Sequence, residues 1–282
     1  MAWQSYYHYQ RKSVLITGGS SGIGLALANR LMELGANVYL LARRQDALLE
    51  AEAGLQIHRQ NADQKTGILQ ADVADYQAIT AGLQNFIDEN GCPDILINSA
   101  GITHPAEFQD TSLDIYRSLM EVNYFGTVHT TQAVLPRMVK RRSGHIINLC
   151  SSAGFVGVYG YSAYSGSKFA VRGYTDTIRA EVKPRGIRMS IVFPADVDTP
   201  QLAYETPIKP AVTREISRSA RVMQPEAVAE YILRKAARGA YIIVPGFDNR
   251  MLYHLNNFLG PLAYPVMDSM VADAIRKTQK TT

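Results

Sequence analysis

The amino-acid sequence predicts an α/β protein: a single doubly wound domain with a mostly parallel sheet and helices on both faces. Two observations lead to this expectation. Short apolar runs alternate with longer stretches of helical spacing, and this alternation is typical of a parallel sheet whose strands are joined by helices. The runs are continuously apolar rather than alternating, as in strands that are buried on both faces.

Strands and helices can be assigned along the whole chain. Near its end a helix is expected from Pro225 to Arg238, because a proline at a first helical position favours a helix start. No repeat or sharp change of composition divides the chain, so residues 1–282 are predicted to form one domain. Strands are expected over residues 13–17, 37–42, 67–71, 94–98, 145–150, 188–193 and 241–244, and further helices over 24–34, 76–90, 112–142 and 162–183.

The region after the sixth strand differs in character. It contains Pro194, Pro200, Pro207 and Pro210 among many polar residues, and prolines in helix interiors break helices. We therefore expect a long loop over about 195–220. Long loops in compact domains are commonly lids or binding loops, so this one is expected to cover the substrate.

Composition excludes several classes of protein. The chain has 282 residues, 46% of them hydrophobic, and a net charge of +4, which excludes a disordered chain. Two cysteines are too few for a disulfide scaffold and indicate a reducing compartment, so a cytoplasmic location is expected. The first 13 residues predict no secretory signal, and no apolar run reaches the ~20 residues of a transmembrane helix.

Two further kinds of partner are not expected. The basic cluster Lys140-Arg141-Arg142 is typical of a helix C-terminus, so it does not indicate nucleic acid. The histidines and cysteines do not have the spacing of metal ligands, so no metal site is predicted.

A glycine-rich turn follows the first expected strand. Its sequence is Gly18-Gly19-Ser20-Ser21-Gly22-Ile23-Gly24, and it leads directly into a helical pattern. Glycines let the backbone approach a pyrophosphate, and the N-terminus of the following helix offers unpaired N–H groups to the phosphates. The turn therefore predicts a dinucleotide-binding fold of the Rossmann type. A glycine-rich turn without a ligand is the alternative.

Two arginines follow the second expected strand. In dinucleotide-binding folds an acidic residue about 20 residues beyond the glycines binds the ribose of NAD, but here Ala42 is followed by Arg43 and Arg44. A guanidinium suits a 2′-phosphate, because it is planar and permanently charged. The sequence therefore favours NADPH over NADH. The alternative is that both arginines are solvated residues at a helix start.

A tyrosine and a lysine lie four residues apart in an expected helix. Tyr164 and Lys168 therefore share one helix face. A phenol with a pKa near ~10 is a poor acid–base catalyst at neutral pH, and a nearby ammonium lowers that pKa. The pair by itself is a weak signal, because such residues often meet by chance on a helix surface.

Together these motifs resemble the short-chain dehydrogenase/reductase family from about Ser13 to Thr199. Ser99 departs from the family's Asn-Asn-Ala-Gly motif at its second position, and Ser152 is adjacent to the expected catalytic serine. The matching segments are Thr17-Gly18-x-x-x-Gly22-x-Gly24, Asp72 after a strand, Asn98-Ser99-Ala100-Gly101, the helix residue Asn123, and Ser151 placed 13 residues before Tyr164.

The resemblance implies a carbonyl reductase that uses NADPH. Tyr164 would protonate the developing alkoxide, Ser151 would hydrogen-bond the carbonyl oxygen, and Lys168 would lower the pKa of Tyr164 and hold the nicotinamide ribose. Asn123 would return the proton through a water. The residues expected to bind the cofactor are Thr17, Gly18, Ser20, Ser21, Gly22, Ile23, Gly24, Arg43, Arg44, Asp72, Val73, Asn98, Ala100, Gly101, Tyr164, Lys168, Pro194 and Thr199.

One segment is similar to a subgroup of the family. The sequence from Pro194 to Pro200, followed by Glu205-Thr206-x-x-Lys209-Pro210, looks like that of the 3-ketodihydrosphingosine reductases. That resemblance implies reduction of a long-chain 3-keto base in sphingolipid synthesis. The alternatives are a reductase of 3-oxoacyl thioesters or of a steroid or retinoid ketone, and a non-catalytic NADPH-binding scaffold or sensor. Relatives of this kind are commonly dimers or tetramers, so a homo-oligomer is expected.

The tail over about 249–280 has two amphipathic stripes, and Pro261 breaks the first of them. The first consists of Met251, Leu252, Leu255, Phe258, Leu259 and Leu262, and the second of Val266, Met267, Met270, Val271, Ala274 and Ile275. Most such helices bury their apolar face against the protein body or a partner subunit. The alternatives are that the tail walls a pocket for a long hydrocarbon chain, or that it makes a peripheral contact with a membrane surface.

Overall fold

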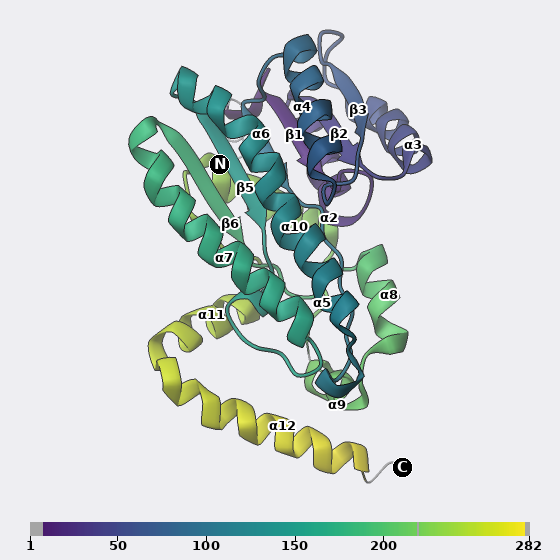
Figure 1. Ribbon diagram of the computed structural model, residues 1–282, viewed down its shortest axis with the longest axis vertical. Coiled ribbons are helices and arrows are strands. Elements are labelled where there is room, and N and C mark those ends of the chain that lie inside the picture. Colours follow the sequence, from purple (N-terminus) through teal and green to yellow (C-terminus); the bar gives the residue numbers. More distant parts are fainter. Residues whose placement is uncertain (1–7, 219, 280–282) are drawn as a thin grey trace.

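The computed structural model describes residues 8–218 and 220–279. Seven parallel strands form one sheet in the order β3-β2-β1-β4-β5-β6-β7 (Figure 1). This confirms the predicted doubly wound α/β fold. The strands are β1 (Ser13–Thr17), β2 (Asn37–Ala42), β3 (Thr66–Gln70), β4 (Ile95–Asn98), β5 (Gly144–Leu149), β6 (Ile187–Val192) and β7 (Ile242–Ile243).

Helices connect the strands and continue beyond them. The expected helix over 112–142 is divided, because a π-helical turn separates α5 from α6. The helices are α2 (Gly22–Glu33), α3 (Gln45–Leu55), α4 (Tyr76–Asn90), α5 (Leu113–Leu119), α6 (Gly126–Arg141), α7 (Ser162–Val182), α8 (Pro200–Ile208), α9 (Ala211–Ser217), α10 (Pro225–Ala237), α11 (Phe247–Leu259) and α12 (Ala263–Gln279). The short turns are η1 (Gln56–His58), η2 (Phe108–Asp110), η3 (Met120–Phe125), η4 (Ser152–Gly154), η5 (Lys183–Arg185) and η6 (Gly260–Leu262).

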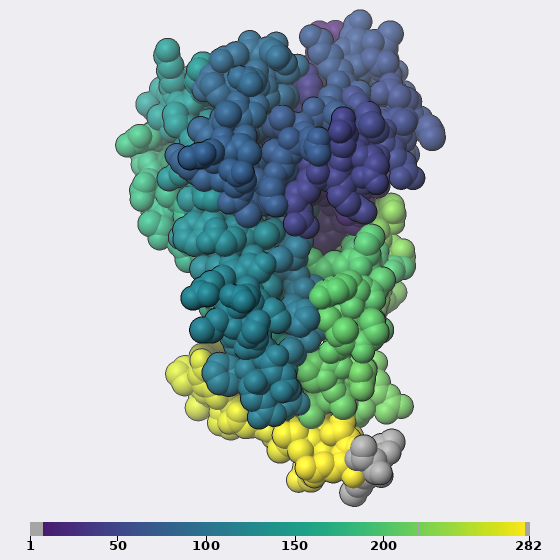
Figure 2. Space-filling view, turned by 45° about the vertical axis from the view of Figure 1, so that its right-hand side comes forward, coloured from purple at the N-terminus to yellow at the C-terminus, as the bar shows by residue number. Residues whose placement is uncertain are grey.

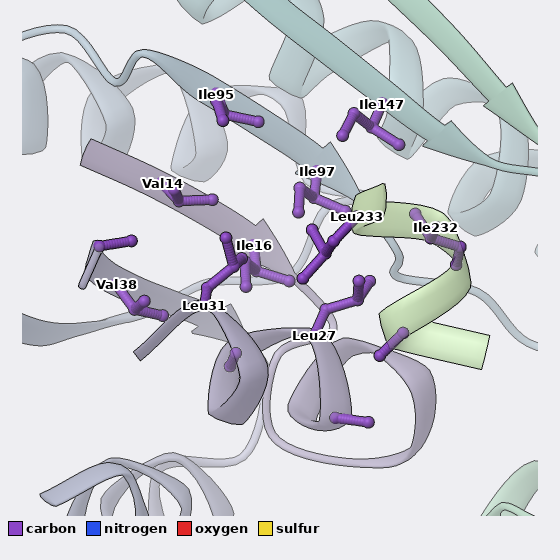
Figure 3. Close-up of a cluster of buried hydrophobic side chains, with 14 of the residues drawn as sticks. Val14, Ile16, Leu27, Leu31, Val38, Ile95, Ile97, Ile147, Ile232 and Leu233 are labelled. Carbon is purple, nitrogen blue, oxygen red and sulfur yellow. The ribbon is translucent and has the colours of Figure 1, made fainter. Parts of the chain in front are cut away.

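Side chains from alternate positions of β1 reach the two faces of the sheet. Val14 and Ile16 pack against Leu27 of α2 and Leu233 of α10 (Figure 3). Leu15 belongs to the cluster on the other face, to which α4, α6 and α7 contribute. Because each fully buried aliphatic side chain contributes about 1.5–3 kcal/mol, these two layers hold the strand ends in fixed positions.

The order of the strands places the functional site. The chain winds outward from β1 to β3 on one side and from β4 to β7 on the other, so the order reverses between β1 and β4. Ligands of open parallel sheets bind at the carboxyl ends of the strands beside such a reversal. The segments after β1, β4 and β5 therefore meet where a cofactor is expected.

The expected loop over 195–220 is largely helical, which corrects the prediction. Pro200 occupies the first turn of α8, where a missing N–H costs nothing, and Thr199 caps this helix by accepting a hydrogen bond from Leu202 N. Pro210 precedes α9 as its N-cap residue. The prolines thus delimit two short helices, and only Pro207 lies inside one, near the end of α8.

The tail forms α11, η6 and α12, which run below the sheet, with α12 beside α9 (Figures 1 and 2). α11 contacts the body through the buried ring of Tyr253, which packs on Phe155, and through two hydrogen bonds: Asn249 Nδ2 donates to Phe193 O at 2.7 Å and Asn256 Nδ2 donates to Phe155 O at 2.9 Å. The first apolar stripe faces away, with Met251 and Phe258 47% and 87% exposed. The expectation that this stripe is buried against the body is therefore wrong.

The second stripe is divided between the body and the solvent. Ala274 is buried and Val271 is partly buried, whereas Met270 is exposed. Among the helices that the structure describes, none is both long and apolar enough to cross a bilayer.

Candidate active site

The glycine-rich turn after β1 is locked against the segment after β4. A Cβ atom on Gly18 would lie 2.8 Å from Ala100 Cα, and Gly18 has a φ of +65°, so a glycine is required on both grounds. Thr17 Oγ1 accepts hydrogen bonds of 3.1 Å from the backbone N–H groups of Ser99 and Ala100. The predicted turn and the Asn98–Gly101 motif therefore form one unit.

A cavity of about 180 Å³ lies beside this unit. Nine of the residues predicted to bind the cofactor line it: Gly18, Ser20, Ser21, Arg43, Arg44, Asp72, Val73, Ala100 and Gly101. Sequence reasoning missed five others: Leu41, Ala42, Ala71, Ile102 and Val122. Four of these lie at or just beyond the ends of β2, β3 and β4, so the rule that parallel sheets bind ligands at their carboxyl ends would have found them.

Arg43 reaches over this cavity with a largely free guanidinium. Its side chain is 59% exposed, and its Nη1 lies 3.8 Å from Asp72 Oδ2, beyond the 2.7–2.9 Å typical of a charge-assisted hydrogen bond. Arg44 is the N-cap residue of α3. Arg43 is therefore the better placed of the two for a 2′-phosphate.

The remaining predicted cofactor residues surround the cavity without lining it. A Cβ on Gly22 would be 3.2 Å from Cγ2 of Thr199, the N-cap residue of α8, and a Cβ on Gly24 would strike Gly18 O. Pro194 O accepts a hydrogen bond from Ser152 N. Ile23 lies between the two glycines in the first turn of α2.

Asn98 has a different environment from the one expected. Its side chain is buried and bonded to Asn148 Oδ1 at 2.9 Å, Thr131 Oγ1 at 3.2 Å and Thr130 Oγ1 at 2.7 Å. These bonds join β4 to β5 and α6, so the side chain stabilises the strand end that carries the site.

The predicted catalytic residues converge at the start of α7. Tyr164 is buried, and the neighbouring Ser151 side chain acts to lower its pKa. Ser151 Oγ also accepts from Ala153 N and so caps η4. Ser151, rather than its neighbour Ser152, is thus the serine that meets the tyrosine.

Lys168 is buried one turn further along α7. Its Nζ lies 5.7 Å from the centroid of the Tyr164 ring and donates to Leu149 O at 3.2 Å. Gly101 has no side chain to obstruct it, since a Cβ there would lie 3.4 Å from this Nζ. Burial lowers the pKa of Lys168.

The protonation of Tyr164 differs from the expectation. Burial raises the pKa of Tyr164, the negative charge of Glu205 adds to the rise, and hydrogen bonds with Ser151 and Gln201 oppose it. The lowering predicted from Lys168 is not found, because the cost of burying a phenolate exceeds the opposing effects. Tyr164 is therefore a phenol at neutral pH, which suits a proton donor.

Asn123 lies in the π-helical turn η3 and is buried. Its Oδ1 accepts from Ile102 N at 2.8 Å, and its Nδ2 donates to Ile102 O at 3.0 Å and to Ser167 Oγ at 2.9 Å. The side chain connects the segment after β4 with α7. A proton relay through Asn123 stays a prediction.

Sequence reasoning assigned no role to the residues that α8 brings to the site. The side chain of Gln201 donates to Glu205, and Glu205 is buried against Tyr161. Gln201 and Glu205 are four residues apart, so they lie on one face of α8. That spacing was available in the sequence, but the proline-rich context hid the helix.

A family model described as short chain dehydrogenase matches residues 12–208. The chain belongs to the short-chain dehydrogenase family. It is 37% identical over 250 residues to a Bos taurus protein named 3-ketodihydrosphingosine reductase, which covers 88% of this chain and 75% of the relative. A Danio rerio 3-dehydrosphinganine reductase has the same identity and coverage. A Dictyostelium discoideum 3-ketodihydrosphingosine reductase is 30% identical and covers 97% of this chain and 86% of the relative.

Solved structures agree with the fold. A 3-oxoacyl-[acyl-carrier protein] reductase from Brucella melitensis superposes with a TM-score of 0.72 at 27% identity, covering 84% of this chain and 90% of that one. The protein is thus an NADP-dependent oxidoreductase that acts on a carbonyl or alcohol group, as predicted. NADPH fits the site, because close-packed glycines leave the backbone of the turn uncovered and Arg43 supplies a cation beside the cavity.

Proposed function

We propose that this protein reduces 3-ketodihydrosphingosine to dihydrosphingosine with NADPH, in sphingolipid synthesis. One observation carries the proposal: the similarity to the mammalian 3-ketodihydrosphingosine reductases covers 88% of the chain, whereas the general family model ends at residue 208. The retained tyrosine, lysine and serine favour an enzyme over a scaffold or sensor, because a binding protein has no need of a proton donor.

The catalytic residues have separable tasks in this reaction. When bound, NADPH supplies a hydride to the carbonyl carbon. Tyr164 donates its proton to the carbonyl oxygen, and Ser151 stabilises the charge that develops there by a hydrogen bond. Lys168 holds the nicotinamide ribose, and Asn123 keeps the loop after β4 in register with α7. Arg43 binds the 2′-phosphate.

A second cavity suits the hydrocarbon chain of the substrate. Its volume is about 530 Å³, within the 300–1,000 Å³ typical of ligand pockets. Val158 and Tyr159 line one side, and Met267, Val271 and Ile275 of α12 line the other. Ser165, which follows Tyr164, also lines it, so the cavity and the proton donor share the start of α7. We propose that α12 walls a site for the long chain.

A panel of substrates tests the function. We expect NADPH oxidation with 3-ketodihydrosphingosine to exceed that with a short 3-oxoacyl thioester by at least tenfold in kcat/KM. The second candidate is a 3-oxoacyl thioester reductase, which the similarity to the Brucella structure favours. A preference for the thioester would establish that candidate, and activity with neither would leave the retinoid and steroid ketones, which complete the panel. NADPH binding without turnover of any ketone would indicate a scaffold or sensor.

The exposed apolar side of α11 suits a membrane surface. Met251, Leu255 and Phe258 are 47%, 47% and 87% exposed, on the side of the helix opposite Asn249 and Tyr253, which contact the body. We propose that this side enters the lipid interface, where a membrane-resident substrate is met. Leu255→Glu with Phe258→Glu should abolish co-sedimentation with phosphatidylcholine vesicles. Retained co-sedimentation would contradict the contact.

Self-association competes for the same surface. We expect a dimer or tetramer by light scattering, and we expect its mass to be unchanged in the Leu255→Glu/Phe258→Glu variant. A monomeric variant would instead assign the apolar side of α11 to a subunit contact. The predicted cytoplasmic location stays a prediction.

A further inference from the structure

Helix α8 carries a buried carboxylate close to the catalytic tyrosine. Glu205 is 6% exposed although it is a charged residue. Tyr161 donates a hydrogen bond to its Oε2 at 2.5 Å, and Gln201 Nε2 donates to its Oε1 at 3.3 Å. Charged side chains are rarely buried unless they are paired, so the position of Glu205 calls for a cation.

The carboxylate lies next to the proton donor of the reaction. Tyr161, which donates to Glu205, has its ring beside that of Tyr164, 5.9 Å apart between centroids. The negative charge of Glu205 also contributes to the raised pKa of Tyr164. Because Tyr161 contacts both, Tyr164 and the Glu205 carboxylate are close enough to meet neighbouring groups of one small molecule.

The charges around Glu205 do not balance. Lys209 Nζ lies 3.7 Å from Glu205 Oε2 and 3.5 Å from Asp196 Oδ2, and Lys209 is only 7% exposed. Two carboxylates therefore share one ammonium, which leaves one negative charge among these three groups. Both distances exceed the 2.7–2.9 Å of a charge-assisted hydrogen bond, so each carboxylate retains capacity for a further donor.

The proposed substrate has a cation at the matching place. In 3-ketodihydrosphingosine an amino group is bonded to the carbon next to the carbonyl carbon, and in its protonated form it carries a positive charge. We propose, resting on the proposed function, that Glu205 selects an amino ketone by accepting a hydrogen bond from this amino group while Tyr164 donates to the ketone oxygen. Asp196 and Lys209 set the charge of the cluster, and Tyr161 and Gln201 hold the carboxylate in place.

A purely structural role is the competing explanation. Glu205 would then serve only to anchor α8 to Tyr161, and its loss would affect all substrates alike. A comparison of two substrates on the same variant separates these explanations, because partial unfolding reduces the activity on both by the same factor.

The experiment compares 3-ketodihydrosphingosine with a ketone of the same chain that lacks the amino group. In Glu205→Gln, kcat/KM for the amino ketone should fall about ten- to hundredfold, as expected for a lost charge-assisted hydrogen bond. The value for the ketone without the amino group should change less than threefold. Asp88→Asn is the control, because Asp88 of α4 makes an exposed ion pair with Arg137 of α6, and it should preserve the ratio of the two values.

Equal losses on both substrates would overturn the role of Glu205 and leave the reductase function standing. Wild-type protein that does not reduce 3-ketodihydrosphingosine would overturn both proposals. Wild-type protein that reduces both ketones equally well would overturn the selection alone.

A measurement on the unaltered protein covers the case in which Glu205→Gln does not fold. Dihydrosphingosine and the diol of the same chain without the amino group should both inhibit competitively. The inhibition constant of dihydrosphingosine should be at least tenfold lower, because only the amine meets Glu205. Equal inhibition constants would overturn the proposal.

Discussion

Asn123 Nδ2 donates a hydrogen bond to Ser167 Oγ at 2.9 Å, which ties the π-helical turn η3 to α7 directly beside Lys168. π-helical turns are often found at functional sites. In this turn the buried side-chain amide of Asn123 makes three hydrogen bonds, two with the backbone of Ile102 and one with Ser167. The position of the catalytic helix therefore depends on a residue that lies 41 positions before Tyr164 in the chain.

Replacing Asn123 by alanine tests this connection. Asn123→Ala leaves the backbone N–H and C=O of Ile102 without their side-chain partners, and an unsatisfied buried group costs about 1–3 kcal/mol. We expect the free energy of unfolding, measured in urea, to fall by that amount. Asn257→Ala removes only a hydrogen bond within α11 and should change it by less than ~0.5 kcal/mol. Equal stabilities of the two variants would argue against the connection.

Arg43 is expected to decide the choice of cofactor. Arg43→Gln removes the cation beside the cavity, so KM for NADPH should rise about ten- to hundredfold while KM for NADH changes little. Steady-state kinetics with both cofactors measure this. Arg137→Gln, which affects an exposed ion pair with Asp88 on the outer surface, should alter neither value. An equal rise for NADPH and NADH would make Arg43 a structural residue.

We predict that the segment from Asp198 to Ser219, of which Ser219 lies outside the described residues, becomes more ordered when NADPH is added. Gly22 meets Thr199 at the start of α8, so a ligand on the glycine turn would stabilise the lid and exclude water. Trypsin cleavage after Arg214 and Arg218 should slow at least several-fold with NADPH. Cleavage after Arg59, at an exposed position before β3, serves as the reference. Equal cleavage rates with and without cofactor and substrate would show that this segment does not act as a lid.

His145 is expected to make the fold sensitive to acid. Burial lowers its pKa to about 3, whereas the unfolded chain has a pKa near 6.5. Between these values only the unfolded state binds the proton. The free energy of unfolding therefore decreases by about 1.4 kcal/mol for each unit by which the pH is lowered. Above pH 6.5 the group is neutral in both states and contributes no pH dependence.

Urea unfolding at pH 7.5, 6 and 5 measures this slope. His145→Asn lacks the group that titrates, so its stability should depend less steeply on pH, even though it loses the hydrogen bond to Ser190. His254→Gln, at an exposed position of α11, should retain the wild-type slope. A wild-type slope in His145→Asn would assign the acid sensitivity to other groups.

The sheet and the cofactor turn could be predicted from the sequence because their signals are local. A buried parallel strand is a continuous apolar run, and Gly24 is needed by contacts with Gly18 and Gly19 within one strand–turn–helix unit. The pair Tyr164 and Lys168 follows from helical spacing in the same way.

The helical lid and the exposed tail could not be predicted, since both depend on distant partners. An amphipathic pattern shows that α11 has an apolar side but not what covers it, and here the opposite side, with Asn249 and Tyr253, contacts the body. The buried Glu205 accepts a hydrogen bond from Tyr161, 44 residues earlier, and its sequence neighbours do not reveal that partner. The raised pKa of Tyr164 likewise results from burial, which spacing does not reveal.

The role of Tyr164 is the central claim, and Tyr164→Phe tests it most directly. The ring and its packing are kept while the proton donor is lost. We expect turnover of 3-ketodihydrosphingosine to fall below a few percent of wild type, with the dissociation constant of NADPH, measured by fluorescence titration, unchanged within about twofold. Turnover that stays above a few percent, with NADPH bound normally, would contradict the account.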